Sequence, residues 1–323
     1  MRERLTTLGR SHERRLAIIV MIVALFFAVT APGFCSLGNL KDLLESHAVL
    51  AIMATGLLVV LIAGGIDISF PAIAAVSQYL VAIFILHRGG NWTLAFLLAG
   101  GLGALFGLVN ALLIRGLQAP PVIVTIATMT FYFSMLMFST KGAPLYDLPD
   151  WFTAKIAILS LPFPVIVAGM VLAATAFLLR RLALGRQIYG LGGNPEAAKR
   201  MGCNIARLQF FVYGFSGAMA GVAGLMQAHR VEEVVPNALI GRELDVLAAV
   251  VLGGASLTGG VGTVGGTLLG IVLLAMLRNG LTLLGVSSYS FGAVTGLVIL
   301  LSVSATALAQ RRLRRIGGPH GTA

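Results

Sequence analysis

The sequence predicts an all-α, polytopic membrane protein, and composition, glycine content and the form of the apolar runs all point the same way. Hydrophobic residues make up 58% of the 323 residues and charged residues only 11%, a balance outside that of soluble globular proteins. The 40 glycines, set against 8% aromatic residues, suit helices that pack backbone against backbone. A membrane barrel would show segments of about ten residues that alternate apolar and polar. The runs here are long and do not alternate, so helices are expected.

Ten apolar spans can be read along the chain in windows of about twenty residues, the length that crosses a bilayer as a helix. Their expected bounds are 16–34, 48–64, 70–86, 92–114, 120–140, 162–180, 208–228, 244–258, 262–279 and 289–309. The pairs within 48–86 and 244–279 are short and rich in glycine. Re-entrant or broken helices there would leave eight or nine crossings instead of ten.

Lysine and arginine indicate the side that faces the cytoplasm, because cytoplasmic loops carry an excess of both. They gather in the first fifteen residues, between 180 and 207, and in the stretch "RRLRR" near the end. Each cluster adjoins an apolar span, so the net charge of +11 indicates membrane topology and not a nucleic-acid partner. Ten crossings would place all three clusters inside. The expected organisation is a cytoplasmic amino-terminal segment 1–15, a single transmembrane domain 16–309 with a cytoplasmic loop 181–207, and a cytoplasmic tail 310–323.

Two stretches, "LIAGGIDIS" and "VLGGASLT", resemble each other and predict two related halves. Each apolar run ends at a glycine pair, followed by a polar residue and a hydroxyl. In this match Asp67 corresponds to Ser256, and Ser69 to Thr258. Glycine-interrupted apolar segments at corresponding places in two halves point to the translocation region of a transporter. The expected helix breaks are Gly64, Gly65, Gly253 and Gly254.

Asp67 has no other charged residue near it in the sequence, and two compatible interpretations account for it. A charged residue inside a span costs about 2.5 to 3.5 kcal/mol on insertion scales, so Asp67 is not expected to face lipid. It can serve as the N-cap of a helix entering at residue 70, with Pro71 in the first turn. It can also line a polar cavity, because backbone groups freed at a break need water or polar neighbours. The candidate pathway residues are Asp67, Ser69, Gln78, Asn110, Ser256 and Thr258. Polar residues such as Gln78 and Asn110, taken singly, are equally explained as helix-to-helix hydrogen bonds.

The segment "NPEAAKRMG" in the long basic loop carries the signals of a short helix. Asn194 is a good N-cap, Pro195 suits the first helical position, and Glu196 places an acid in the first turn. Gly202 ends the helix after about two turns. A helix this short is not stable alone. It therefore needs a partner surface, in its own chain or in another protein.

Longer stretches resemble a known family. The stretch "NPEAAKRMGCNIARL" resembles the coupling segment of ABC importer permeases, and the run from "ELDVLAAVVLGGASLTGG" onward resembles ribose-type permeases of monosaccharide ABC importers. "LLVVLIAGGIDISF" and "GLVNALLIRGLQAPPVIVTIATM" are similar to first-half signatures of the same family. The chain departs from the family pattern near Tyr132 and Phe133, at Pro71, and at Arg242, where a tyrosine is usual. These departures leave the sugar open.

The resemblance implies a permease subunit that forms the path for a monosaccharide or related neutral polyol in a bacterial inner membrane. It implies three partners: an ABC ATPase subunit, expected to be a tandem-domain chain, a periplasmic sugar-binding protein, and a second permease chain that is either a copy or a paralogue. ATP and magnesium would bind the ATPase, since this chain has no GxxxxGK[ST] sequence, and no cofactor or metal is expected here. The residues that would couple to the ATPase are Asn194, Glu196, Ala197, Ala198, Arg200 and Gly202.

Other classes of membrane protein are less well supported. A stand-alone secondary transporter or facilitator for a small polar solute remains the alternative, but ion coupling normally needs carboxylate chains or charged pairs within the membrane, and the spans contain none. A membrane enzyme would need a cluster of residues with catalytic spacing, which the sequence lacks. A path for amino acids would present positive charge to a carboxylate, and none is convincing inside the spans, so a neutral sugar is favoured.

Overall fold

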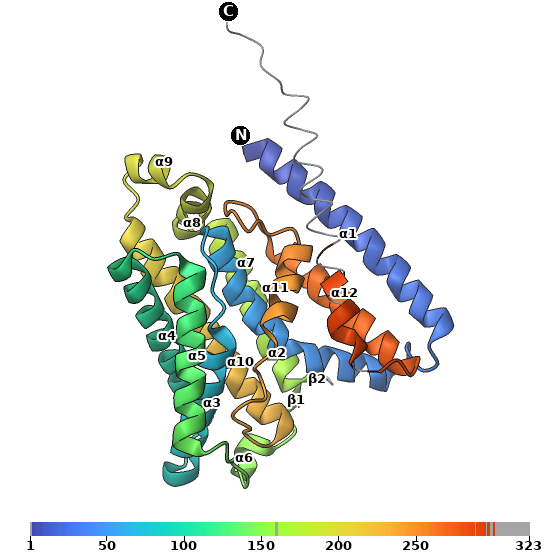
Figure 1. Ribbon diagram of the computed structural model, residues 1–323. Coiled ribbons are helices and arrows are strands. Elements are labelled where there is room, and N and C mark those ends of the chain that lie inside the picture. The colour runs from blue at the N-terminus through green and yellow to red at the C-terminus, as the bar shows by residue number, and fades with distance from the viewer. Residues whose placement is uncertain (1, 159–160, 288, 295, 298–299, 301–323) are drawn as a thin grey trace, which may run out of the picture.

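The computed structural model describes residues 2–158, 161–287, 289–294, 296–297 and 300. It is a bundle of helices, which confirms the predicted helical fold class (Figure 1). Two very short strands, β1 (Ala157–Ile158) and β2 (Leu161–Pro162), pair antiparallel. The helices are α1 (Arg2–Thr30), α2 (Leu37–Ile62), α3 (Phe70–Arg88), α4 (Trp92–Leu117), α5 (Pro121–Thr140), α6 (Asp150–Thr153), α7 (Phe163–Arg181), α8 (Ala183–Gly193), α9 (Pro195–Arg200), α10 (Ile205–Val231), α11 (Glu243–Leu252) and α12 (Val264–Leu283).

Seven helices of the described part are long and apolar enough to cross a membrane: α2, α3, α4, α5, α7, α10 and α12. They correspond to seven of the ten predicted spans. The largest difference is at α2, which begins at Leu37 and not at residue 48. Ser36 starts this helix as its N-cap by accepting a hydrogen bond from the backbone N–H of Asn39. Charged residues between 41 and 45 keep this first part out of any apolar window, which is why the sequence placed the start too late.

The other three predicted spans are not among these seven helices. The apolar part of α1 runs only from Leu16 to Thr30, short of the predicted end at 34. The helix expected at 244–258 ends at Leu252, so α11 provides about 15 Å of helix against a hydrocarbon core of about 30 Å. Most of the last span, 289–309, and the whole predicted tail 310–323 lie outside the described residues. Ten crossings and two halves therefore stay predictions.

Glycines bring α4 and α10 into backbone contact. A Cβ added at Gly103 would overlap the carbonyl oxygen of Gly217, and one at Gly107 would overlap that of Tyr213. In the reverse direction, a Cβ at Gly221 of α10 would overlap the carbonyl oxygen of Ala99 in α4. Small residues allow this approach, as the glycine content of the sequence predicts. The most enclosed helix is α2, with 83% of its apolar window buried, whereas α5 and α7 have 28% buried and present most of their surface outward.

Candidate functional site

The first glycine pair lies directly after the end of α2. The backbone N–H groups of Ala63, Gly64 and Gly65 donate to the carbonyls of Val59, Leu61 and Val60, respectively, which is the bonding pattern of a helix that terminates. Gly64 has φ +85°, a left-handed conformation that glycine adopts without a side-chain clash. A Cβ on Gly65 would lie 2.5 Å from the hydroxyl oxygen of Tyr213. Glycine is therefore favoured at both positions, by the backbone conformation at Gly64 and by the nearby tyrosine at Gly65.

The second glycine pair repeats this ending after α11. Gly253, Gly254 and Ala255 donate in turn to the carbonyls of Ala249, Val251 and Val250, and Gly254 has φ +90°. The left-handed residue is thus the first glycine of one pair and the second glycine of the other. The sequence match of Gly64 with Gly253 is wrong by one residue, because the bonding pattern equates Gly64 with Gly254.

The polar residues after each pair form the same small turn. The backbone N–H and the hydroxyl of Ser69 both donate to Asp67 Oδ1, at 2.9 and 2.6 Å. In the second break the N–H of Thr258 donates to Ser256 Oγ at 3.2 Å, and the two hydroxyl oxygens lie 2.8 Å apart. A side-chain oxygen that accepts from the N–H two residues on is a common way to turn the chain. Asp67 and Ser256 therefore occupy equivalent places in the two turns. The first break has one more residue between its left-handed glycine and this turn.

Asp67 is fully buried at the centre of a polar network that joins four elements. Its Oδ2 accepts from the hydroxyl of Ser216 in α10 at 2.9 Å. Ser69 Oγ accepts from the Asn110 side-chain amide in α4 at 2.7 Å, and the hydroxyl of Tyr132 in α5 donates to Asn110 Oδ1 at 3.3 Å. Each member binds another member, so these buried polar groups satisfy one another and fix the break relative to α4, α5 and α10.

Asp67 is not the N-cap of α3, contrary to the first interpretation of the sequence. Ser69 occupies that position, and its side chain makes no capping hydrogen bond. Pro71 lies in the first turn, as predicted, and has no N–H that needs a partner. Asp67 instead accepts hydrogen bonds from the backbone N–H and the hydroxyl of Ser69, the residue that precedes the helix. Its oxygens contact donors of this chain and not an open cavity.

The other predicted pathway residues lie in different surroundings. Gln78 is buried in α3, donates to the carbonyl of Val235 at 3.5 Å, and has an Oε1 with no partner among the described residues. Ser256 is half-buried and Thr258 is exposed. The structure thus brings together Asp67, Ser69 and Asn110, while Gln78 and the second-break residues lie apart from them.

Some members of the network escaped the sequence analysis. Ser216 looks like one more small residue in the glycine-rich α10, and nothing in its neighbours marks it. Tyr132 was noted only as a departure from a family pattern. Thr125 in α5 accepts a hydrogen bond from the backbone N–H of Ile68 at 3.2 Å, so a side chain supplies one of the polar partners that a helix break needs.

The end of α8 lies against both breaks. The N–H of Gly260 donates to the carbonyl of Ile62 at 2.9 Å, and a Cβ on Gly192 would overlap that same carbonyl oxygen. A Cβ on Gly259 would lie 2.7 Å from the Gly192 oxygen and 2.8 Å from Gly64 Cα. Glycine is therefore needed where the three segments meet, which we call the glycine junction (Gly64, Gly192, Gly259 and Gly260).

Tyr189 links α8 to the second break by a hydrogen bond two residues after Gly260. Its hydroxyl donates to the carbonyl of Gly262 at 2.6 Å. Burial raises the pKa of Tyr189 to about 12, so the hydroxyl keeps its proton and remains a donor at physiological pH. The loop 181–207 is therefore an ordered part of the bundle. The sequence indicated one helix in it, and α8 was missed.

The short helix α9 forms as the sequence predicts. Asn194 Oδ1 accepts from the N–H of Ala197 at 3.0 Å, Pro195 and Glu196 occupy the first turn, and Gly202 follows the helix with φ +83°. Ala198 is fully buried against this chain. Of the other predicted coupling residues, Ala197 is half-buried, and the exposed ones are Asn194, Glu196, Arg200 and Gly202. One face of α9 is thus covered and the other is free for a partner.

These features together define a class of protein: a polytopic membrane transport protein with interrupted helices and an exposed helix joined to the interruptions. The described part of the chain contains no group of three His, Cys, Asp or Glu residues that could hold a metal ion. The chain belongs to the family described as branched-chain amino acid transport system, permease component, which it matches over residues 39–303.

Several relatives are similar over nearly their whole length. The ribose import permease protein RbsC of Escherichia coli (strain K12) is 36% identical over 298 residues, which are 90% of this chain and 92% of that protein. RbsC of Bacillus subtilis (strain 168) is 36% identical over 292 residues, 89% of each chain. The L-arabinose ABC transporter permease protein AraH of Azospirillum brasilense is 30% identical, over 88% of this chain and 85% of that protein. No solved structure matches the chain.

These relatives confirm the predicted resemblance to sugar importer permeases. As a permease subunit, the chain is a multi-pass membrane protein and not an enzyme.

Proposed function

We propose that this chain is the transmembrane permease subunit of an ATP-driven importer in a bacterial inner membrane, and that it forms the path for a monosaccharide or a closely related polyol. Relatives named for ribose and L-arabinose transport support this class of solute. One observation carries the mechanism. The exposed helix α9 follows α8 directly, and α8 ends in the glycine junction against both breaks.

The proposal requires energy from another subunit. An ABC ATPase subunit, expected to be a tandem-domain chain, would bind ATP and magnesium and hold the exposed face of α9. A periplasmic sugar-binding protein would deliver the solute at the other end of the bundle. A second permease chain, either a copy or a paralogue, would complete the path. Asn194, Glu196, Ala197, Arg200 and Gly202 would form the coupling contact, and Ala198 would anchor α9 to its own chain.

Movement of α9 would reach the path through the glycine junction. Backbone lies against backbone at this point, with no flexible side chain between to absorb a displacement. A shift of Gly192 would move the end of α2 and the segment before α12 together. The network of Asp67, Ser69 and Asn110 would then pass the displacement to α4, α5 and α10. In this mechanism Asp67 has a mechanical role and does not need to touch the solute.

The proposed topology has ten crossings, both termini in the cytoplasm and two related halves. Figure 1 supports a common side for three cytoplasmic elements, since the first residues of α1 lie at the same end of the bundle as α8 and α9, with α6 at the opposite end. The matching turns at Asp67–Ser69 and Ser256–Thr258 support the two halves. The alternative, a lone facilitator, would leave the exposed face of α9 without a role.

Reconstitution tests the function directly. The chain is placed in liposomes with the proposed ATPase subunit and sugar-binding protein, and the uptake of labelled ribose or arabinose is measured with and without ATP. We expect uptake only with all components and ATP. A Glu196→Lys variant should lower both uptake and solute-stimulated ATP hydrolysis. Asp150→Lys is the matched control, because Asp150 is also an exposed acid in the first turn of a short helix, but in α6. Uptake by the chain alone would contradict the proposal.

A further inference from the structure

The amino-terminal helix α1 contacts both ends of the second break with two adjacent residues. His12 Nε2 lies 3.0 Å from the carbonyl oxygen of Leu252, the last residue of α11. The hydroxyl of Thr263, which immediately precedes α12, donates to Glu13 Oε1. The break is the chain between Leu252 and Thr263. A single turn of α1 therefore holds both flanks of the break and limits how far they can separate.

Thr263 makes two hydrogen bonds at the start of α12. Its Oγ1 accepts from the backbone N–H of Gly266 at 3.0 Å, so Thr263 is the N-cap of this helix. Its own hydroxyl proton is donated to Glu13. A hydrogen bond to a carboxylate is stronger than one between neutral groups, and it fixes the direction of the hydroxyl, which leaves a lone pair for the N–H of Gly266. Glu13 thus orients the residue that caps α12.

The first break has the same arrangement, but its carboxylate comes from within the break. Asp67 accepts from the hydroxyl of Ser69, which occupies the N-cap position of α3. The second break has Ser256 in the place of Asp67, and a serine hydroxyl carries no charge. Glu13 supplies a carboxylate to Thr263 from 250 positions away in the chain. Each break therefore ends at a hydroxyl that a carboxylate holds.

The helix that leads to α9 binds the neighbouring residue of the second break. The Tyr189 hydroxyl of α8 donates to the carbonyl of Gly262 at 2.6 Å. Burial raises the pKa of Tyr189, the Arg180 guanidinium lowers it, and the Glu13 carboxylate raises it. Both charged groups therefore lie near this hydroxyl. Consecutive residues of the break are thus held by two different helices, Gly262 by α8 and Thr263 by α1.

The two helices that flank the break form a hairpin with backbone packed against backbone. A Cβ on Gly270 of α12 would overlap the carbonyl oxygen of Ala249 in α11. A Cβ on Gly266 would overlap the carbonyl oxygen of Gly253, directly after α11. Small residues permit this close approach. The contacts leave no flexible side chain between the two backbones, so we treat the α11–α12 hairpin as one rigid body.

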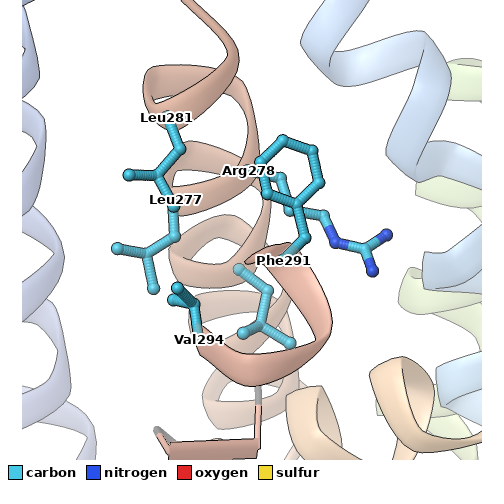
Figure 2. A pocket seen from close by; sticks show the side chains of 6 residues that line it. Leu277, Arg278, Leu281, Phe291 and Val294 are labelled. Carbon is cyan, nitrogen blue, oxygen red and sulfur yellow. The ribbon is translucent and has the colours of Figure 1, made fainter. Parts of the chain in front are cut away.

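An ion pair joins the same two helices at the end of the hairpin away from the break. Arg278 of α12 and Asp245 in the first turn of α11 form this pair at 2.8 Å. Figure 2 shows the Arg278 guanidinium extending to one side of α12, away from Leu277 and Leu281. The hairpin is thus closed at both ends. A displacement imposed on the start of α12 is carried along its whole length.

We propose that Glu13 is a positioning residue for transport, which together with Tyr189 fixes the start of α12 so that a displacement of α8 moves the α11–α12 hairpin as one body. Without Glu13, Thr263 would be free to turn, and the start of α12 would follow α8 less closely. This inference rests on the proposed import function and deepens it. It assigns a part in the mechanism to α1, which lies outside the coupling helix α9 and outside the network around Asp67.

The number of sugar molecules taken up per ATP hydrolysed tests the proposal. It is measured in liposomes that contain the chain with the proposed ATPase subunit and sugar-binding protein, using labelled ribose or arabinose. We expect Glu13→Ala to lower this ratio about tenfold, in line with the loss of a hydrogen bond to a charged group. ATP hydrolysis itself should continue, because the variant leaves α9 intact. Glu13→Gln keeps an oxygen acceptor at the same reach and should retain part of the ratio. Arg14→Ala, the exposed neighbour on α1, should behave as the wild type.

A merely structural role for Glu13 predicts a different result. A loss of stability would lower uptake and ATP hydrolysis in the same proportion, because fewer complexes would be folded, and their ratio would not change. An unchanged ratio in Glu13→Ala would therefore overturn the proposal. The same conclusion would follow from an equal fall in Arg14→Ala, or from a Glu13→Gln variant that performs no better than Glu13→Ala.

Thermal unfolding of the full-length chain in detergent tests the contact without ATP. Glu13→Ala, Thr263→Val and the double variant are compared, and residues that bind each other should give a double variant less destabilised than the sum of the two single variants. The same cycle with Arg14→Ala in place of Glu13→Ala should be additive. Additive effects of Glu13→Ala and Thr263→Val would overturn the inference. If this pair is coupled but ATP never drives uptake by the wild-type assembly, the import function fails while the hold of α1 on the second break stands.

Discussion

The two glycine breaks share one backbone ending and one polar turn, yet they are held in place by different parts of the molecule. Buried side chains from α4, α5 and α10 surround the first break and bind it through Asp67 and Ser69. The second break has only the small Ser256–Thr258 pair, which is partly open to its surroundings. The amino-terminal helix holds it instead: His12 lies 3.0 Å from the carbonyl oxygen of Leu252, and Thr263 donates to Glu13. The same local structure thus occurs once as a break enclosed by side chains inside the bundle and once as a break that, apart from its contacts with α8, is held by one outer helix.

The largest effect is expected where both breaks meet α8. Gly192→Ala would drive a methyl group into the Ile62 carbonyl, and we expect it to destabilise the protein by about 3 kcal/mol, the upper end for overpacking. Gly193→Ala is the matched control, since a Cβ there meets nothing within 4 Å. Thermal unfolding in detergent compares the two. Similar melting temperatures would mean that the glycine junction is not tightly packed.

Removing the acid of the first break should come next. Asp67→Leu leaves the buried donors of Ser69 and Ser216 without an acceptor, at about 1–3 kcal/mol for each group. We expect ATP-driven uptake to fall by more than about tenfold, the factor that about 1.4 kcal/mol produces, while the amount in the membrane changes little. Asp67→Asn keeps one oxygen acceptor and should lose less. Uptake assays and immunoblots of membranes measure both quantities, and equal loss of both in Asp67→Leu would favour a purely structural role.

Alanine at Gly64 and at Gly254, the left-handed glycine of each break, tests whether α1 supports the second break and not the first. Gly64→Ala should cost roughly 1–2 kcal/mol, because it places a Cβ in a left-handed conformation. Gly254→Ala has the same strain and in addition brings the Cβ within 2.6 Å of the His12 ring. It should therefore destabilise the protein more, and His12→Ala should remove the excess. If the double variant His12→Ala/Gly254→Ala is no more stable in thermal unfolding than Gly254→Ala alone, α1 does not hold the second break as described.

The hydroxyls of the two turns give the last comparison, which includes the smallest effect expected. Ser69→Ala leaves the buried amide of Asn110 without its acceptor and should cost about 1–3 kcal/mol. Thr258→Ala removes an exposed contact and should cost less than about 1 kcal/mol. Melting temperatures of the two variants under identical conditions give the comparison. Equal losses would show that the second break is as enclosed as the first.

The sequence predicts those parts of the molecule that depend on local chemistry. Long apolar runs, the Asn194 cap and Gly202 follow from the neighbouring residues, and the structure has helices where these signals lie. The repeat between the breaks is also visible, but its glycine register is displaced by one, because a glycine pair does not reveal which member adopts φ above zero. Only the hydrogen bonds at the end of each helix decide that.

Features that depend on contacts between distant segments could not be predicted. Ser216 binds Asp67 across 149 positions of the chain, and Gly192 meets two breaks that lie far away in the sequence. The role expected for Asp67 as an N-cap failed for the same reason, since its partners come from other helices. Arg242 was noticed as unusual, but its position beside residues of α2, α10 and α11 depends on how these helices pack.

Close contact between α4 and α10 limits how the transporter can move. With carbonyl oxygens resting on glycine Cα atoms along several turns, neither helix can slide or roll against the other without a collision of main-chain atoms. The two helices must therefore move as one rigid body when the transporter changes between outward-open and inward-open states. Relative motion is then left to helices such as α5 and α7, which bury only 28% of their apolar windows within this chain.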